Sequence, residues 1–84
     1  MNNRILVKLY VPTLEIKYDV WIPANKTVYY VISMMAKAIN EISGGNYRPT
    51  EIPTLYNKDL IIPYNINQKI RETDIRNGTE LVLI

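Results

Sequence analysis

Apolar and polar residues alternate in two segments near the start of the chain. Residues 4–11 read RILVKLYV, and residues 14–22 read LEIKYDVWI. A period of two, rich in β-branched and aromatic residues, is typical of a strand with one buried face. Only Pro12 and Thr13 separate the segments, so we predict an antiparallel hairpin. The residues expected on its outer face are Arg4, Leu6, Lys8 and Tyr10 in the first strand and Glu15, Lys17, Asp19 and Trp21 in the second.

A helical period replaces this alternation after Pro23. Thr27 is a good N-cap, because its hydroxyl can accept a hydrogen bond from a free backbone N–H of the first turn. Gly44-Gly45 supplies the left-handed residue with which many helices end. We therefore predict an amphipathic helix over residues 28–43. Its buried face is expected to hold Val28, Val31, Ile32, Met35, Ala38, Ile39 and Ile42.

The second half of the chain is less regular until its last residues. Pro49 and Pro53 exclude a helix from the loop after the glycines. Asn77-Gly78 is a turn signal, and the strand predicted after it alternates to the final residue. The elements expected between these points are short strands at residues 52–56 and 60–62, and a loop at residues 67–75 that inserts Ile70 and Ile75 into the core, with one helical turn between them.

The terminal strand, residues 79–84, is too apolar for a frayed end, so we expect it inside the sheet. If it pairs parallel with the first strand, the helix forms the right-handed crossover that chain chirality favours. The predicted fold is therefore α+β: one helix packed across a mixed sheet of about five strands in the order 2-1-5-3-4.

Composition limits the classes of function. The 84 residues, 48% of them hydrophobic, suffice for one domain spanning residues 1–84. Ten basic and eight acidic residues are interspersed, which is not the clustered charge of a nucleic-acid-binding surface. The first apolar segment is interrupted by Lys8 and ended by Pro12, too early for a signal or membrane segment. We expect a cytoplasmic protein.

No residue set predicts catalysis. The chain has neither cysteine nor histidine, which removes thiolate chemistry and the commonest general base. Ser33 and Lys37 are one helical turn apart, but on the polar face, where such pairs are usually solvated. Glu72 and Asp74 are close in sequence, yet nothing places them in a pocket. We expect no catalytic residues, no cofactor, no metal and no small-molecule substrate.

The order of elements resembles the β-grasp fold of ubiquitin. The closing segment carries the likeness most clearly: Ile70, Asp74-Ile75, Asn77-Gly78 and then the final strand. More narrowly, length, the segment YDVWIP and the residues Asp74, Ile75, Asn77, Gly78, Leu81 and Leu83 are similar to those of the YukD/EsaB family. These are small bacterial ubiquitin-like proteins associated with type VII secretion. The resemblance implies an accessory or regulatory component on the cytosolic side of such a system, with a membrane component as one candidate partner.

Two other functions stay open beside it. A covalent modifier or sulfur carrier needs a flexible tail ending in Gly-Gly, whereas the only Gly-Gly here is Gly44-Gly45, at the predicted helix end. A nucleic-acid-binding β-grasp module is disfavoured by the scattered charge. We therefore expect a module that binds a protein partner without being conjugated to it.

The outer face of the sheet is the predicted binding surface. Leu6, Trp21, Val82 and Ile84 are expected to share an apolar patch ringed by Lys8, Lys17 and Glu80. Exposed patches of this kind mark interfaces, and tryptophan is enriched among residues that dominate binding. The alternative is that Trp21 folds over the hairpin and covers the sheet edge. The predicted protein-binding residues are Leu6, Lys8, Tyr10, Trp21, Val82 and Ile84. A weak homo-oligomer contact through Tyr29, Tyr30 and Met34 stays open.

Overall fold

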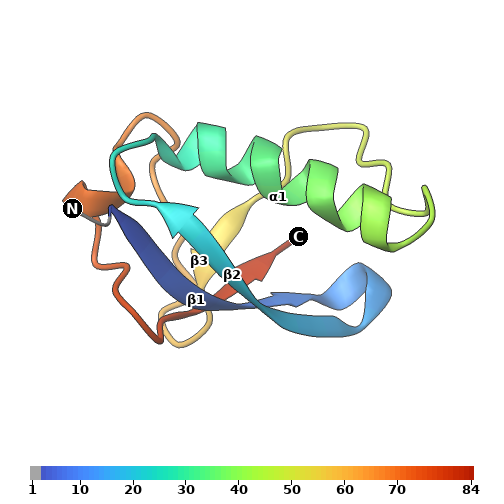
Figure 1. Cartoon of the computed structure of the whole chain (residues 1–84), viewed down its shortest axis with the longest axis horizontal. Helices are drawn as coiled ribbons and strands as arrows, with labels where there is room; N and C mark the ends of the chain where they lie inside the picture. The colour runs from blue at the N-terminus through green and yellow to red at the C-terminus, as the bar shows by residue number, and fades with distance from the viewer. Residues whose placement is uncertain (1–2) are drawn as a thin grey trace.

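In the computed structural model, which describes residues 3–84, one helix lies across one face of a four-stranded sheet (Figure 1). Along the chain, the elements are β1 (Arg4–Val11), β2 (Ile16–Pro23), α1 (Val28–Ile42), β3 (Leu55–Asn57) and β4 (Glu80–Leu83), with 3-10 turns at Pro12–Leu14 and Ile70–Glu72. The predicted α+β class and single helix are confirmed.

The hairpin of β1 and β2 is antiparallel, as predicted. Its turn is longer than expected, because Leu14 lies in the 3-10 turn and not in the second strand. Glu15 closes the turn in the left-handed region at φ 54°, and its N–H donates to the Pro12 carbonyl at 3.1 Å. The leucine side chain still packs against the core.

Strand β4 lies inside the sheet, between β1 and β3, as the apolar end of the chain predicted. It is parallel to β1, with Leu9 beside Leu81, and antiparallel to β3, with Leu55 beside Leu83. Leu81 and Leu83 are almost fully buried. The observed order β2-β1-β4-β3 is the predicted order without its last strand.

The prediction of a fifth strand at residues 60–62 was wrong. Asn57 directs a turn instead: its side chain accepts from the Asp59 N–H at 2.9 Å, and its carbonyl accepts from the Ile61 N–H at 2.9 Å. Only an isolated bridge between Tyr56 and Pro63 follows. Leu60, Ile61 and Ile62 consequently remain exposed.

Helix α1 begins as predicted, since the Thr27 hydroxyl accepts from the Tyr30 N–H at 3.1 Å. It ends one residue before the predicted boundary, with Gly44 and Gly45 in the left-handed region. Ile42 was expected in the core but is 66% exposed, because it is the last helical residue, beyond the buried turn that ends at Ile39. The helical residues buried against the sheet are Val28, Val31, Ile32, Met35 and Ile39.

The loop before β4 closes the core as expected. Ile70 and Ile75 are fully buried, with the 3-10 turn Ile70–Glu72 between them. Within residues 3–84, no helix has the length and apolar character needed to cross a membrane.

Candidate protein-binding face

The sheet face opposite α1 carries the side chains that alternate with the core residues of each strand. On β1 these are Leu6, Lys8 and Tyr10, which alternate with buried Val7, Leu9 and Val11. The hairpin register therefore places each outward residue of β1 opposite an outward residue of β2.

Three rows cross this face. In the first row, Trp21 on β2 lies opposite Leu6 on β1. In the second, Asp19, Lys8 and Glu80 lie side by side on β2, β1 and β4. The third row consists of Lys17, Tyr10, Val82 and Tyr56, one from each strand of the sheet.

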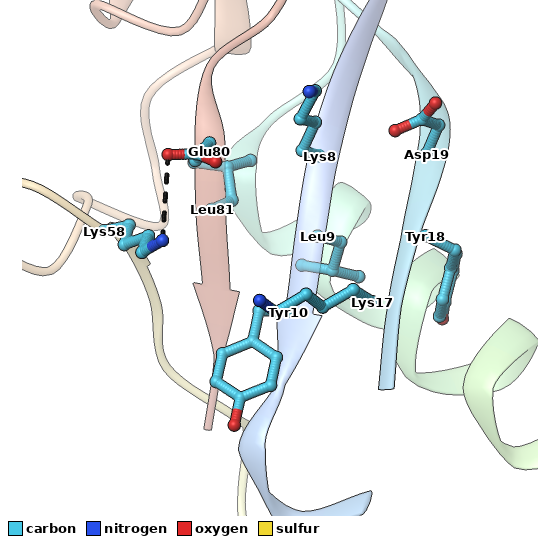
Figure 2. A pocket seen from close by; sticks show the side chains of 9 residues that line it. All are labelled: Lys8, Leu9, Tyr10, Lys17, Tyr18, Asp19, Lys58, Glu80 and Leu81. Carbon is cyan, nitrogen blue, oxygen red and sulfur yellow. Dashed lines mark ion pairs between the residues drawn. The ribbon is translucent and has the colours of Figure 1, made fainter. Parts of the chain in front are cut away.

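The middle row is charged, as Figure 2 shows. At its outer end the Lys58 ammonium lies 3.9 Å from a Glu80 carboxylate oxygen. Figure 2 also shows Lys8 and Asp19 on the neighbouring strands β1 and β2. Together with Tyr10 and Lys17 of the third row, these side chains line an open hollow of about 450 Å³.

The predicted single apolar patch is therefore divided. Leu6 and Trp21 lie on one side of the charged row, and Val82 lies on the other. The division follows from the parallel register, which sets Val82 beside Tyr10, four residues beyond Leu6. The sequence identifies the outward face of each strand, but not the register between distant strands.

Val82 lies on the outer face but is only 5% exposed. Its neighbours are Tyr10 on one side and Tyr56 on the other. The accessible surface of this row therefore comes mainly from the two tyrosines and not from Val82. The Lys17 ammonium lies 5.4 Å from the centre of the Tyr10 ring, a cation–π arrangement. The sequence analysis missed Tyr56, because three residues of β3 are too few to show an alternation.

Trp21 and Leu6 form the apolar part of the accessible face. Trp21 is 51% exposed and lines a hollow together with Leu6. The floor beside it is fixed by the Asn77-Gly78 turn: the Leu6 N–H donates to the Asn77 side chain, and the Gly78 N–H donates to the Leu6 carbonyl, both at 2.8 Å. The resulting hollow of about 310 Å³ is lined by Leu6, Lys8, Asp19, Trp21, Asn77 and Gly78.

Ile84 does not join this hollow. Its N–H donates to the Thr54 carbonyl at 2.9 Å, which extends the pairing of β4 with β3. The side chain is 56% exposed and lines a separate hollow with the proline-containing loop of residues 46–54. Of the six predicted residues, the structure brings Leu6, Lys8 and Trp21 together around one hollow.

Within the described part of the chain, the groups with a shifted pKa are three tyrosines, and burial is the main cause in each. Burial, followed by the hydrogen bond that its hydroxyl donates to Asp74 at 2.6 Å, raises the pKa of Tyr64 to about 12. Burial also raises the pKa of Tyr18 and of Tyr47. Ser33 and Lys37 are both exposed. Across residues 3–84, no group of three or more acidic side chains is placed to hold a metal ion.

Solved structures share this architecture along the whole chain. The EccD5 ubiquitin-like domain from Mycobacterium xenopi superposes with a TM-score of 0.80 at 17% identity, covering 99% of this chain and 94% of that one. The fold is the ubiquitin-like β-grasp. The ubiquitin-like domain of the Mycobacterium tuberculosis type VII secretion protein EccD1 matches with a TM-score of 0.76 at 15% identity, covering 100% and 99%.

A chain of the ESX-5 inner membrane complex has a TM-score of 0.79 at 19% identity. The match covers 99% of this β-grasp chain but only 21% of the larger one. A chain of a toluene 4-monooxygenase complex has a TM-score of 0.78 at 11% identity, covering 95% of both chains. No family model and no curated protein matches the sequence. At these identities the likeness establishes the fold alone.

Proposed function

We propose that this protein is a non-enzymatic ubiquitin-like interaction module on the cytosolic side of a bacterial type VII secretion system, like the YukD/EsaB proteins that its sequence resembles. The observation that carries the proposal is the full-length likeness to the EccD ubiquitin-like domains. The larger chain of the ESX-5 inner membrane complex contains a similar domain, which makes a membrane component of the secretion complex the proposed partner.

The proposed contact surface is the hollow beside Trp21. A half-exposed tryptophan buries a large apolar area when a partner covers it, and such residues often dominate binding energy. Lys8 and Asp19 at the rim present one charge of each sign. A partner with the reversed pair of charges would gain specificity from them, because mismatched charges are costly to bury.

The proposed role does not include conjugation. Gly44 and Gly45 both adopt positive φ directly after α1, so they serve the turn out of the helix. The intact mass of the protein isolated from its host tests this part of the proposal. Unmodified mass is the expected result, and higher-mass conjugates would support a covalent modifier instead.

Deletion of the gene in its host tests the secretion role. We expect reduced export of the small helical proteins that type VII systems secrete, restored by the native gene but not by the Trp21→Ala variant. Ile42→Ala is a matched control, because Ile42 is also exposed and lies outside the outer sheet face. Normal export in the deletion strain would contradict the proposal.

A further inference from the structure

One end of the molecule joins three segments that are distant in sequence. The Ala24 N–H donates to the Asn3 carbonyl, which places the start of β1 there. The Arg71 N–H donates to the Ala24 carbonyl, and the Ile70 N–H donates to the Lys26 carbonyl, both at 2.9 Å. A bridge pairs Thr27 with Lys69. Figure 1 shows the result at the end where β1 starts: the connection from β2 to α1 lies close to the 3-10 turn before β4.

The positive charge of the protein is concentrated at this end. Residues 3–4, 23–30 and 66–72 contain four basic side chains and one acidic one, whereas the rest of the chain has six basic and seven acidic residues. The net charge of +2 therefore arises here. The basic residues are Arg4, Lys26, Lys69 and Arg71, and all are exposed.

Among the described residues, no carboxylate lies within ion-pair distance of Lys26, Lys69 or Arg71. The ion pair of this part of the chain joins Lys58 to Glu80, on the sheet face. The single local acid, Glu72, uses a carboxylate oxygen to accept from the Lys69 backbone N–H at 2.7 Å. The Lys26 ammonium lies over the Tyr30 ring, 5.3 Å from its centre. The positive potential of Lys26, Lys69 and Arg71 is therefore directed at solvent.

Apolar and aromatic side chains accompany the cations. Tyr29 and Tyr30 are 47% and 48% exposed, and Ile66 is 39% exposed. The Tyr29 N–H donates to the Ile66 carbonyl at 3.0 Å, which holds the first turn of the helix against the loop that carries Ile66. Tyrosine combines an apolar ring with a polar hydroxyl, so exposed tyrosines suit the boundary between lipid and water.

We propose that this basic end, made of Lys26, Tyr29, Tyr30, Ile66, Lys69 and Arg71, binds the surface of an anionic phospholipid membrane. Basic residues near such a surface are attracted to its negative potential, and the adjacent tyrosines and isoleucine insert at headgroup depth. A nucleic acid fits less well, because its backbone needs a longer track of cations than one end of this domain provides.

The first turn of α1 does not supply a single-phosphate site. Its backbone N–H groups are already bonded: that of Val28 to the Gln68 carbonyl, that of Tyr29 to Ile66, and that of Tyr30 to the Thr27 hydroxyl. Side chains must make the contacts, so the attraction depends on surface charge density and not on one headgroup. This inference is independent of the proposed secretion role, since it uses a different surface.

Vesicle flotation with the full chain tests the inference. We expect binding to vesicles of phosphatidylcholine with about 30 mol% phosphatidylglycerol at low salt, and none to phosphatidylcholine alone. Binding should vanish at about 0.5 M NaCl, because salt screens exposed charges. The double variant Lys69→Gln/Arg71→Gln should reduce the partition coefficient at least about tenfold, since each basic residue near the surface contributes about fivefold.

Two control variants make the test specific. Lys37→Gln/Arg48→Gln removes the same charge outside the basic end and should leave binding within about twofold of the native protein. Tyr29→Ser/Tyr30→Ser should weaken binding without changing the net charge. Equal binding by the two charge variants, or no binding by the native protein at low salt, would overturn the proposal. A gel shift with double-stranded DNA that the Lys69/Arg71 variant abolishes, without vesicle binding, would assign the surface to nucleic acid instead.

Discussion

Trp21 lies directly opposite Leu6 across the antiparallel pair of β2 and β1, on the sheet face that α1 leaves open. Because Leu6 is fixed through its backbone to the Asn77-Gly78 turn, the two side chains have a rigid base. This pair is the apolar centre of the proposed protein-binding hollow.

Replacing the tryptophan should separate binding from stability. Trp21→Ala is expected to weaken partner binding by about 2 kcal/mol or more, the scale of a dominant interface residue. The free energy of unfolding should change much less, because the side chain is 51% exposed. Calorimetric titration with the partner and a thermal melt of the same variant measure the two effects. Unchanged affinity would remove this hollow as the binding site.

The terminal strand offers a matched pair of core and surface residues. Leu83 is fully buried between β1 and β3, whereas the next residue, Ile84, is 56% exposed. Leu83→Ala should lower the free energy of unfolding by about 2–5 kcal/mol, the range for truncating a packed side chain. Ile84→Ala should cost less than about 1 kcal/mol. Urea denaturation of both variants measures the difference, and equal losses would contradict a central β4.

Ile61 is held in a conformation that suits a different residue. Its φ is 54°, in the left-handed region. This conformation costs an L-residue about 1–2 kcal/mol. Its side chain is 72% exposed, so little packing would be lost on replacement. Ile61→Asn should therefore raise the free energy of unfolding by about 1 kcal/mol, because asparagine tolerates this region. Ile62→Asn, exposed but without positive φ, is the control and should give no gain.

Tyr64 makes stability depend on pH in the alkaline range. Its pKa in the folded protein is raised to about 12, above the ordinary value of 10.0. Above the ordinary pKa the unfolded chain holds fewer protons than the folded one, so this stabilisation is complete below pH 10 and is lost as pH rises toward 12. The free energy of unfolding should fall more steeply over that interval in the native protein than in Tyr64→Phe. Parallel slopes would show that the Tyr64 proton is not coupled to folding.

Much of the architecture is predictable from local sequence. The helix limits follow from Thr27 and from Gly44-Gly45, because capping depends on neighbouring residues. The central place of β4 follows from its apolar residues, which are unlike those of a frayed strand at the edge of a sheet. The prediction of a strand at residues 60–62 failed, because Asn57 turns the chain before three apolar residues can pair.

The candidate site shows the limit of the same reasoning. Alternation identified Leu6, Trp21 and Val82 as outward residues, since a strand's period of two is a local property. Whether they meet depends on the register of β1 with β4, which joins residues more than seventy positions apart. That register places Lys8 beside Glu80, and therefore a charged row between Trp21 and Val82.

The sequence by itself determined the type of each main element and the face that each residue takes, because dihedral preferences, capping and turn chemistry act over a few residues. Only the tertiary structure decided which faces adjoin. It buried Val82 between two tyrosines, left Trp21 beside Leu6, and gathered Lys26, Lys69 and Arg71 at one end. The physical reason is that core packing fixes strand register and loop placement through contacts between distant segments. A pattern that extends over a few residues contains no information about those contacts.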